Sequence, residues 1–377
     1  MKLQRKNRLR ATALGALAVS GALVLTACGS DDNTGADADG GKTSAAASNI
    51  KCDGAEGQLR ASGSSAQKNA MDLWVKNYMA ACSGVEINYA SSSSGEGIVA
   101  FNQGTVGFAG SDSALKPDEV ADSKKICKTG QGINLPMVGG PVAIGFHLDG
   151  VDKLTLDAST IAQIFDTKIT KWNDKAIAAL NEGVDLPDKA IQPYHRSEDS
   201  GTTQNLGKYL NAAAPSDWKY EAEKKWPAPG GQAASGSSGI ASQVKSVDGS
   251  IGYFELSYAK SQDITTVDIN TGGANPVEAT SENASKAIAA AKVKGTGKDL
   301  ALDLDYTTKA EGAYPLVLVT YEVVCDTGNK ADTLGTVKSF LTYTASADGQ
   351  KVLTDAGYAP IPEAINAKVR ETVAGLK

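Results

Sequence analysis

The chain has 377 residues, of which 41% are hydrophobic and 21% charged, and its formal net charge is −6. These proportions are those of a soluble globular protein. The negative charge argues against a nucleic-acid-binding protein, which normally shows a basic face. It does not exclude a small anionic ligand, because the local field of a site can oppose the charge of the whole molecule.

The first residues have the layout of a secretory signal. A basic head, Met1–Arg10, is followed by the uncharged apolar stretch Ala11–Leu25, and Thr26 and Ala27 lead to Cys28. The apolar stretch is shorter than the ~20 residues that a membrane-spanning helix needs. A Cys at the cut point resembles a bacterial lipoprotein signal, in which the Cys becomes the lipid-bearing mature N-terminus. We therefore expect a signal peptide at 1–27, lipidation of Cys28, and an extracytoplasmic protein anchored by lipid, such as palmitate, to the outer face of the cell membrane. The alternative is an ordinary signal peptide with a chance Cys.

The segment 28–49 is composed almost entirely of Gly, Ala, Ser, Thr and Asp. Such a composition buries too little apolar surface to offset the entropy of ordering, so we expect a flexible stalk. About 350 residues follow the leader, which is enough for two domains.

Beyond the stalk, the chain alternates strands and helices. Apolar residues at helical spacing predict a helix at 66–81, and short apolar runs predict strands on either side of it. Extended segments are predicted at 58–61, 85–89, 106–109, 133–148, 191–195, 251–254 and 314–324. A Ser/Gly loop is predicted at 91–97, and helical segments at 97–102, 159–165, 174–180, 202–211 and 333–345.

Repeated strand–loop–helix units predict an α/β fold whose sheets are mixed and mainly parallel, with helices on their faces. The two long extended runs, 133–148 and 314–324, suggest crossings between two lobes. We expect the first lobe to comprise 50–143 and 316–377, and the second lobe 144–315.

Four cysteines remain after Cys28, and an even number in an exported chain favours disulfides. Cys52 and Cys82 each precede one of the first two predicted strands, so adjacent parallel strands would bring them together. Cys127 precedes the first long crossing and Cys325 ends the return run. We therefore favour the pairs Cys52–Cys82 and Cys127–Cys325 among the three possible pairings; four free buried thiols are the alternative.

Three small-residue loops lie between a predicted strand and a predicted helix: 64–66, 94–97 and 200–203. The first turn of a helix offers unpaired backbone N–H groups and about half a positive charge. Three such ends that converge would bind an anion without a metal or cofactor. Taken singly, Ser and Thr at these positions are more often simple N-caps.

Two charged residues strengthen the case for an anion site. Arg196 precedes the third loop, and its guanidinium can donate to two oxygens of a tetrahedral oxyanion while Glu198 holds it in place. Asp112 follows the strand at 106–109. A carboxylate there can accept the hydrogen that phosphate retains near neutral pH and that sulfate lacks. The alternatives are a solvated surface loop around Arg196 and an N-cap role for Asp112 on a helix from Ser113 onward.

The residues that carry a family resemblance are spread over the chain beyond the stalk. They are the segments Ala61–Ala66, Ser94–Gly97, Phe108–Asp112, Ile169–Asp174, Arg196–Thr203 and Gly249–Tyr253. In combination these segments resemble the phosphate-binding lipoprotein of the bacterial high-affinity phosphate ABC transporter. The resemblance implies a two-lobed periplasmic-binding-protein clamp with phosphate in the cleft between the lobes.

The resemblance also implies a role for each matching residue. Ser65 and Ser94 would donate hydroxyl and backbone N–H groups, and Ala66 its backbone N–H. Asp112 would accept the phosphate hydrogen and Arg196 would be the charged clamp. The donors at the helix end of the second lobe would be Ser200, Gly201 and Thr202. The chain has Ala66-Gln67 where the family often has an aromatic residue and Pro, which puts the packing of the cleft wall in doubt.

The implied protein is a monomeric receptor that is not an enzyme, needs no metal or cofactor, and binds no nucleic acid. Its partners would be inorganic phosphate, the permease subunits of the transporter, and the membrane through the N-terminal lipid. The alternatives are a surface phosphatase, a sensor of phosphate, and a receptor for another oxyanion. The sequence contains no GxSxG or HExxH spacing that would support hydrolysis, and its two histidines are His147 and His195. We expect Trp172, in the fourth segment, to fill the core of the second lobe.

Overall fold

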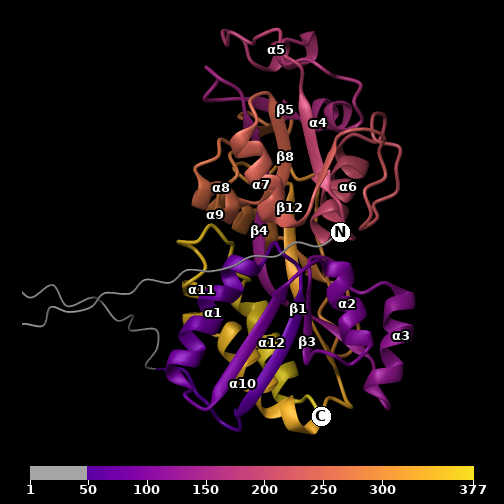
Figure 1. Cartoon of the computed structure of the whole chain (residues 1–377), viewed down its shortest axis with the longest axis vertical. Coiled ribbons are helices and arrows are strands. Elements are labelled where there is room, and N and C mark those ends of the chain that lie inside the picture. The colour runs from indigo at the N-terminus through magenta and orange to yellow at the C-terminus, as the bar shows by residue number, and fades with distance from the viewer. Residues whose placement is uncertain (1–48) are drawn as a thin grey trace, which may run out of the picture. The chain divides into compact units, whose positions relative to one another are not determined.

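The computed structural model describes residues 49–377 (Figure 1). The predicted signal peptide, Cys28 and almost all of the predicted stalk lie outside the described residues. Among the residues that are described, no helix has the length and apolar character needed to cross a membrane.

Strands and helices alternate through most of the described chain. The strands are β1 (Gly57–Gly63), β2 (Val85–Ser91), β3 (Phe108–Ser111), β4 (Gly132–His147), β5 (Thr155–Asp157), β6 (Gln192–Arg196), β7 (Gln232–Ala234), β8 (Ser250–Glu255), β9 (Asp268–Asn270), β10 (Lys292–Val293), β11 (Leu302–Asp303) and β12 (Val317–Cys325). The helices are α1 (Lys68–Ala81), α2 (Ser94–Asn102), α3 (Pro117–Cys127), α4 (Ala158–Phe165), α5 (Lys175–Leu180), α6 (Gly201–Ala213), α7 (Gly236–Ser246), α8 (Leu256–Gln262), α9 (Ser281–Ala289), α10 (Ala331–Thr344), α11 (Ala347–Lys351) and α12 (Glu363–Ala374).

Within residues 49–377, one mixed sheet of eight strands has the order β2-β1-β3-β12-β4-β8-β6-β7. The pairs β1–β2, β1–β3, β6–β8 and β6–β7 are parallel, whereas β12 is antiparallel to β3 and β4, and β4 is antiparallel to β8. The parallel strands lie at the two ends of the sheet, so the α/β architecture and the mixed sheet are confirmed.

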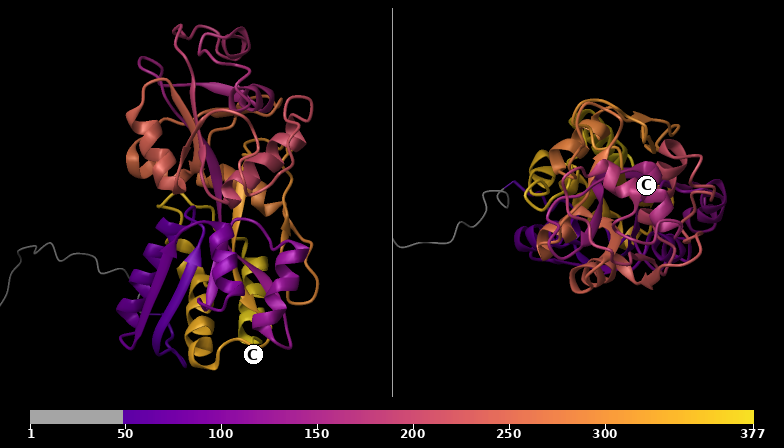
Figure 2. Two further views of the ribbon diagram at one scale, coloured as in Figure 1. Left: turned by 45° about the vertical axis from the view of Figure 1, so that its right-hand side comes forward. Right: turned by 90° about the horizontal axis from the view of Figure 1, so that it is seen from above.

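Two long strands join the two ends of this sheet. Strand β12 pairs with β3 from Tyr321 onward, and β4 pairs with β8 from Val142 onward. Between these points β4 and β12 pair mainly with each other, and the register of β12 shifts between Thr320 and Tyr321. We call the part built on β1–β3 the first lobe and the part built on β6–β8 the second lobe (Figures 1 and 2).

The first lobe packs helices on both faces of its strands. Residues alternate between the faces because successive side chains of a strand point in opposite directions. Phe108 therefore joins a core with α1, α10 and α12, and its neighbour Ala109 joins a second core with α2 and α3. Val324 and Val323 on β12 divide in the same way.

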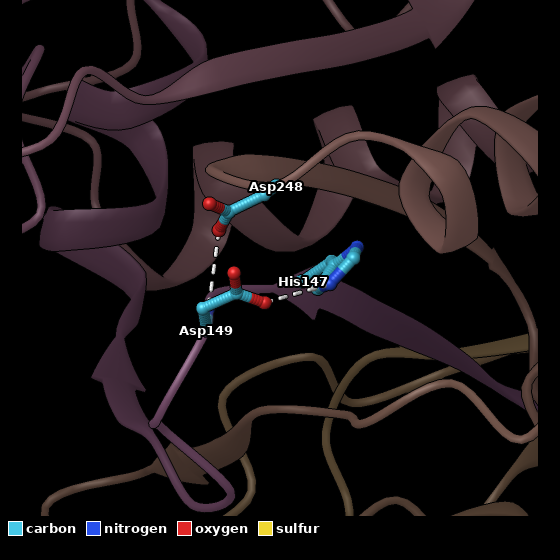
Figure 3. A group of neighbouring side chains, drawn as sticks. All are labelled: His147, Asp149 and Asp248. Atoms are coloured by element: carbon cyan, nitrogen blue, oxygen red, sulfur yellow. Dashed lines mark hydrogen bonds and ion pairs between the residues drawn. The ribbon is translucent and has the colours of Figure 1, made fainter.

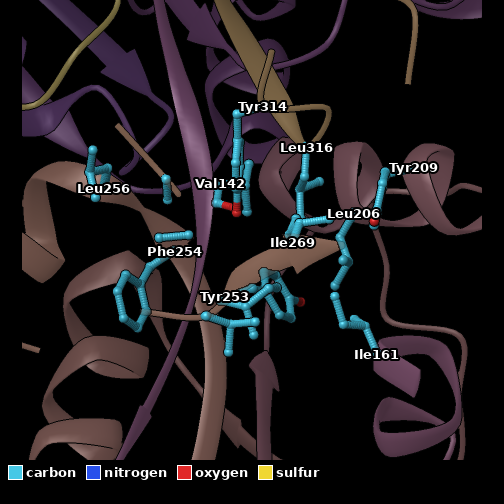
Figure 4. Close-up of a cluster of buried hydrophobic side chains, with 14 of the residues drawn as sticks. Val142, Ile161, Leu206, Tyr209, Tyr253, Phe254, Leu256, Ile269, Tyr314 and Leu316 are labelled. Atoms are coloured by element: carbon cyan, nitrogen blue, oxygen red, sulfur yellow. The ribbon is translucent and has the colours of Figure 1, made fainter. Parts of the chain in front are cut away.

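The second lobe has one large core under α4, α6, α7 and α8 (Figure 4). Tyr314 is fully buried there, and its hydroxyl donates to the carbonyl oxygen of Val142 at 3.0 Å. Trp172 is also fully buried in this core, as predicted, and its indole N–H donates to Gly249 O at 3.1 Å.

The residue boundaries of the lobes stay a prediction. One segment of the predicted second lobe contacts the first: Leu300 belongs to the core around Phe108, and Asp299 accepts hydrogen bonds from the backbone and side-chain N–H groups of Asn134 at 2.8 and 2.7 Å.

Both favoured disulfides are present, with Cα–Cα separations of 5.6 Å for Cys52–Cys82 and 5.4 Å for Cys127–Cys325. The parallel pairing of β1 with β2 explains the first, because it places the chain before each strand at the same edge of the sheet.

One local prediction and one of the alternatives were wrong. Helix α2 begins at Ser94, inside the predicted loop, because the Ser93 side chain caps it by accepting from Glu96 N at 3.2 Å. Helix α3 begins at Pro117, so Asp112 is not the N-cap of a helix from Ser113 onward.

Candidate functional site

Asp112 lies between the two lobes, directly after β3, and is 2% exposed. Its carboxylate accepts from Thr320 Oγ1 at 2.8 Å and from Thr202 Oγ1 at 3.0 Å, with Ser94 Oγ at 3.5 Å. Its backbone N–H donates to Ser94 Oγ at 3.1 Å. Hydroxyls from both lobes thus hold one buried carboxylate.

Arg196 is at the end of β6 and is also 2% exposed, so the surface-loop alternative is wrong. Its Nε donates to Glu198 Oε1 at 2.6 Å, and its Nη2 forms an ion pair with the same oxygen. Glu198 Oε1 also accepts from Gly236 N at 3.0 Å. Burial raises the pKa of Glu198, but the charge and hydrogen bonds of Arg196 lower it by a larger amount, so the pKa lies below its usual value. The carboxylate therefore stays charged and fixes the guanidinium.

Ser65 contacts the first turn of α7 from the opposite lobe. Its Oγ accepts from Ser237 N at 3.0 Å and lies 3.4 Å from Ser237 Oγ, which is 3.4 Å from Arg196 Nη1. Ser237 was not predicted. A signal was present, because Gly236-Ser237-Ser238-Gly239 follows β7 with the same small-residue strand-to-helix pattern as the three predicted loops.

Three tyrosines hold the loop around Ser65. The hydroxyls of Tyr89, Tyr258 and Tyr358 donate to the carbonyl oxygens of residues 64, 65 and 66 at 2.8, 2.6 and 2.7 Å. The N–H of Ala66, a predicted ligand donor, donates instead to Ser64 Oγ at 3.0 Å. In this arrangement the Ala66 amide is engaged within its own loop.

The N-terminus of α6 lies against Asp112. Ser200 is the N-cap and accepts from Thr203 N at 3.3 Å. A Cβ at Gly201 would be 2.6 Å from Ser94 Oγ and 2.8 Å from Asp112 Cβ, so only glycine allows this approach. Predicted donors of the second lobe therefore meet the predicted acceptor of the first.

The structure brings the predicted residues together in one buried region. Each predicted side chain is at most 4% exposed. Tyr253 connects the residues around Arg196 with those around Asp112. Its hydroxyl accepts from Arg196 N at 3.2 Å and lies 2.6 Å from Thr203 Oγ1, which follows Thr202 in the first turn of α6. Burial raises the pKa of Tyr253 to about 12, so it stays a neutral hydrogen-bonding group.

Further interlobe contacts surround this region. Gly95 N donates to Asp199 O at 3.0 Å, and Asn205 Nδ2 donates to Asp112 O at 2.7 Å. Ion pairs join Lys116 to Glu223 and Lys224 to Glu119. The described lobes are therefore closed on each other.

The chemistry of the region suits capture of an oxyanion better than its hydrolysis. A guanidinium, hydroxyls and helix N-termini stabilise negative charge. His195, the histidine beside Arg196, stacks on Trp226 with ring centroids 4.9 Å apart, and its Nδ1 lies 3.0 Å from Arg196 O. It is thus a packed strand-end residue rather than a base beside a hydroxyl.

A separate group of residue types that can bind a metal comprises His147, Asp149 and Asp248 (Figure 3). His147 Nε2 is 3.4 Å from Asp149 Oδ1, and Asp248 Oδ1 accepts from Asp149 N at 3.1 Å. Lys189 pairs with Asp248, and the Asp149 side chain is 80% exposed. Because Lys189 already balances the charge of the Asp248 carboxylate, we propose no metal site here.

Comparison with known proteins identifies the family. A family model described as "PBP superfamily domain" matches residues 45–348. The chain is 42% identical over 377 residues to phosphate-binding protein PstS3 of Mycobacterium bovis, with 99% of each chain covered. It is 38% identical to phosphate-binding protein PstS 2 of Mycobacterium tuberculosis, over 97% of this chain and 98% of that one. The chain belongs to the PstS family of phosphate-binding proteins.

Solved structures agree on the fold. A high-affinity periplasmic phosphate-binding protein, PfluDING, bound with phosphate, superposes with a TM-score of 0.68 at 22% identity, covering 84% of this chain and 93% of that one. A phosphate-binding protein from Stenotrophomonas maltophilia gives a TM-score of 0.67 at 20% identity, covering 85% and 96%. The PstS-family fold of this chain is thus the two-lobed clamp expected from the sequence.

Proposed function

We propose that this chain is an extracytoplasmic receptor that captures inorganic phosphate between its lobes and delivers it to an ABC permease. The observation that carries the proposal is the position of Asp112, a buried carboxylate on the first lobe in contact with the helix end of the second. Family membership supports it, because the relatives are phosphate-binding proteins.

Asp112 is the proposed discriminator. Phosphate near neutral pH carries a hydrogen that the carboxylate accepts, whereas sulfate would place an unprotonated oxygen against it. Thr202 and Ser94 donate to Oδ2 of the carboxylate and Thr320 donates to Oδ1, so Oδ1 keeps an acceptor position for the hydrogen of phosphate. Ser65, Ser94, Arg196, Ser200, Gly201 and Thr202 are the proposed donors, with Ser237 added. The Ala66 N–H donates to Ser64 Oγ, and the hydroxyls of Ser94 and Thr202 donate to Asp112 Oδ2. Each of these groups would have to exchange its present acceptor for the ligand.

Closure of the lobes is the proposed response to phosphate. A ligand that contacts both lobes binds the closed arrangement more tightly than an open one and so shifts the population toward it. The paired central parts of β4 and β12 are the proposed hinge.

Isothermal titration calorimetry tests this function. The native protein should bind one phosphate with poor competition from sulfate. Asp112→Asn should reduce the preference for phosphate over sulfate by about 10-fold or more, the value of one hydrogen bond to a charged group. Asp118→Asn, an exposed change of equal charge, should leave it intact. Equal affinity for both anions in the native protein would refute the role of Asp112, and sustained turnover of a phosphoester would refute a purely receptor function.

The mature protein is proposed to be a monomer held at the outer face of the cell membrane by lipid on Cys28. Metabolic labelling with palmitate tests the anchor, since Cys28→Ser should abolish the label and release the protein into the medium. Label that persists in this variant would refute Cys28 as the attachment site.

A further inference from the structure

A cavity of about 260 Å³ is lined by Asp112 but by none of the other residues of the proposed phosphate site. Both lobes contribute to its walls. Ser113 and Lys116 come from the first lobe, Gln204 and Lys208 from α6 of the second lobe, and Lys294 follows β10. The volume of the cavity is below that of a typical site for a drug-sized ligand and suits a small ion with a few waters.

Two lysines in the lining of the cavity form no ion pair within residues 49–377. These are Lys208 and Lys294. Lys116, by contrast, is neutralised by Glu223. The acidic residues in the lining are Asp112, whose oxygens accept from hydroxyls, and the exposed Asp303.

Lys208 is the more constrained of the two free cations. It is half-buried in the interior of α6, and burial together with the charges of Lys294, Lys224 and Lys116 lowers its pKa to about 8. A long cationic side chain in such a position normally has a partner or reaches water. Of the three neighbouring lysines, Lys116 and Lys224 are balanced by Glu223 and Glu119, whereas Lys294 forms no ion pair with a described residue.

Two neutral side chains in the lining each have one atom without a hydrogen-bond partner among the described residues. Ser113 is 2% exposed, and its Oγ has no hydrogen-bond partner among the described residues. Gln204 Oε1 lacks one as well, although the amide nitrogen donates to Ala222 O at 3.0 Å. Buried polar atoms are normally satisfied, and here two unpaired atoms belong to side chains that line the same cavity as Lys208 and Lys294.

We propose that this cavity is a second oxyanion site, in which Lys208 and Lys294 contact the anion and Ser113 donates a hydroxyl hydrogen. It recognises charge rather than a ligand hydrogen, because the carboxylate of Asp112 is turned to Thr202 and Thr320. Sulfate and phosphate should therefore both bind here, unlike at the proposed phosphate site. The inference is independent of the proposed function.

The test uses mature protein already carrying one equivalent of phosphate, titrated with sulfate at low ionic strength. Low salt is required because exposed charges are screened within ~10 Å at 0.1 M. Calorimetry should show one sulfate bound, and radiolabelled phosphate should stay on the protein. Lys208→Met/Lys294→Met should bind sulfate at least about 10-fold more weakly, since each ammonium contributes a charged hydrogen bond.

The matched control removes two charges elsewhere. Lys76→Met/Lys368→Met changes exposed, unpaired lysines on α1 and α12 and should bind sulfate as the native protein does. If the cavity variant fails to fold, Lys294→Met alone, at an exposed position, serves in its place.

The outcomes separate the two proposals. Sulfate that binds only by displacing phosphate, that does not bind at all, or that binds the cavity variant undiminished would overturn the second site. If the protein takes up sulfate in a Lys208-dependent manner yet binds no phosphate tightly, the second site stands and the proposed function fails.

Discussion

Gly95→Ala is the sharpest test of whether ligand binding requires the lobe contact seen here. Gly95 is in the first turn of α2, and its N–H donates to Asp199 O of the second lobe at 3.0 Å. A Cβ at this position would be 2.6 Å from Asp199 Cβ and 3.1 Å from Asp199 O. Within its own helix the alanine fits, so the clash arises only when the lobes close.

The expected effect follows from the overlap. Forcing a methyl group into a packed contact typically costs ~1–3 kcal/mol, which corresponds to about 5- to 150-fold weaker phosphate binding. Without phosphate the same substitution should hold or raise the melting temperature, because alanine is a better helix residue than glycine by about 1 kcal/mol.

Gly97→Ala is the matched control, on the same helix. Its Cβ would be 2.6 Å from Gly63 Cα and 2.9 Å from Ser62 O, both in the first lobe. Backbone atoms of β1 cannot move aside, so this variant should lose thermal stability with or without phosphate.

Calorimetry gives the phosphate affinity and scanning calorimetry the melting temperature of each variant. Unchanged phosphate affinity in Gly95→Ala would show that the bound state does not use this contact. A fall in ligand-free melting temperature as large as that of Gly97→Ala would show that the clash is not confined to lobe closure.

Three further predictions concern stability. Replacing Cys127 and Cys325 by alanine opens a loop with a sequence separation of 198 residues, and should lower the free energy of unfolding in urea by about 5 kcal/mol. Burial raises the pKa of Glu322 from 4.5 to about 8. The native protein should therefore lose stability as pH rises from 4.5 to about 8. Glu322→Gln should be more stable than the native protein at about pH 9 but not at about pH 4. The pKa of Glu198 is lowered beside Arg196, so this carboxylate stabilises the folded state above pH 4.5, and the stabilisation is lost as pH falls through the lowered pKa. Glu198→Gln should reduce the free energy of unfolding by ~3–5 kcal/mol at neutral pH. The stability of this variant should also fall less steeply than that of the native protein at acidic pH.

Urea and thermal unfolding across pH check all three. A disulfide variant as stable as the native protein would contradict the loop-entropy reasoning. Parallel pH profiles for native protein and Glu322→Gln would show that this carboxyl ionises normally, and an acid limb unchanged by Glu198→Gln would show that its ion pair does not govern acid stability.

The fold could be predicted where the pattern was strong. Long apolar runs predicted β4 and β12, and apolar residues at helical spacing predicted α1. Tertiary packing buries the same apolar residues and so favours the same structure as the local pattern. The small elements β5, β9, β10 and β11 were not predicted, because two or three residues carry no period and owe their pairing to neighbours distant in sequence.

The sequence could indicate residues that the structure brings together, but not the contacts between them. Ser65, Asp112 and Arg196 lie at or shortly after the ends of predicted strands. Ser237 becomes part of the region only because α7 packs its first turn against the other lobe. The engaged N–H of Ala66 depends on the rotamer of a neighbouring serine, which no sequence pattern specifies.

The register shift in β12 has a mechanical consequence. Thr320, at the shift, is bonded to Asp112, while the next residue, Tyr321, already pairs with β3. Bending of β4 and β12, the proposed hinge, would therefore displace Thr320, which donates to the Asp112 carboxylate. Opening of the lobes and the weakening of the contacts around the anion would then occur in the same motion. We therefore expect substitutions along β12 to change the dissociation rate of phosphate more than the preference for phosphate over sulfate.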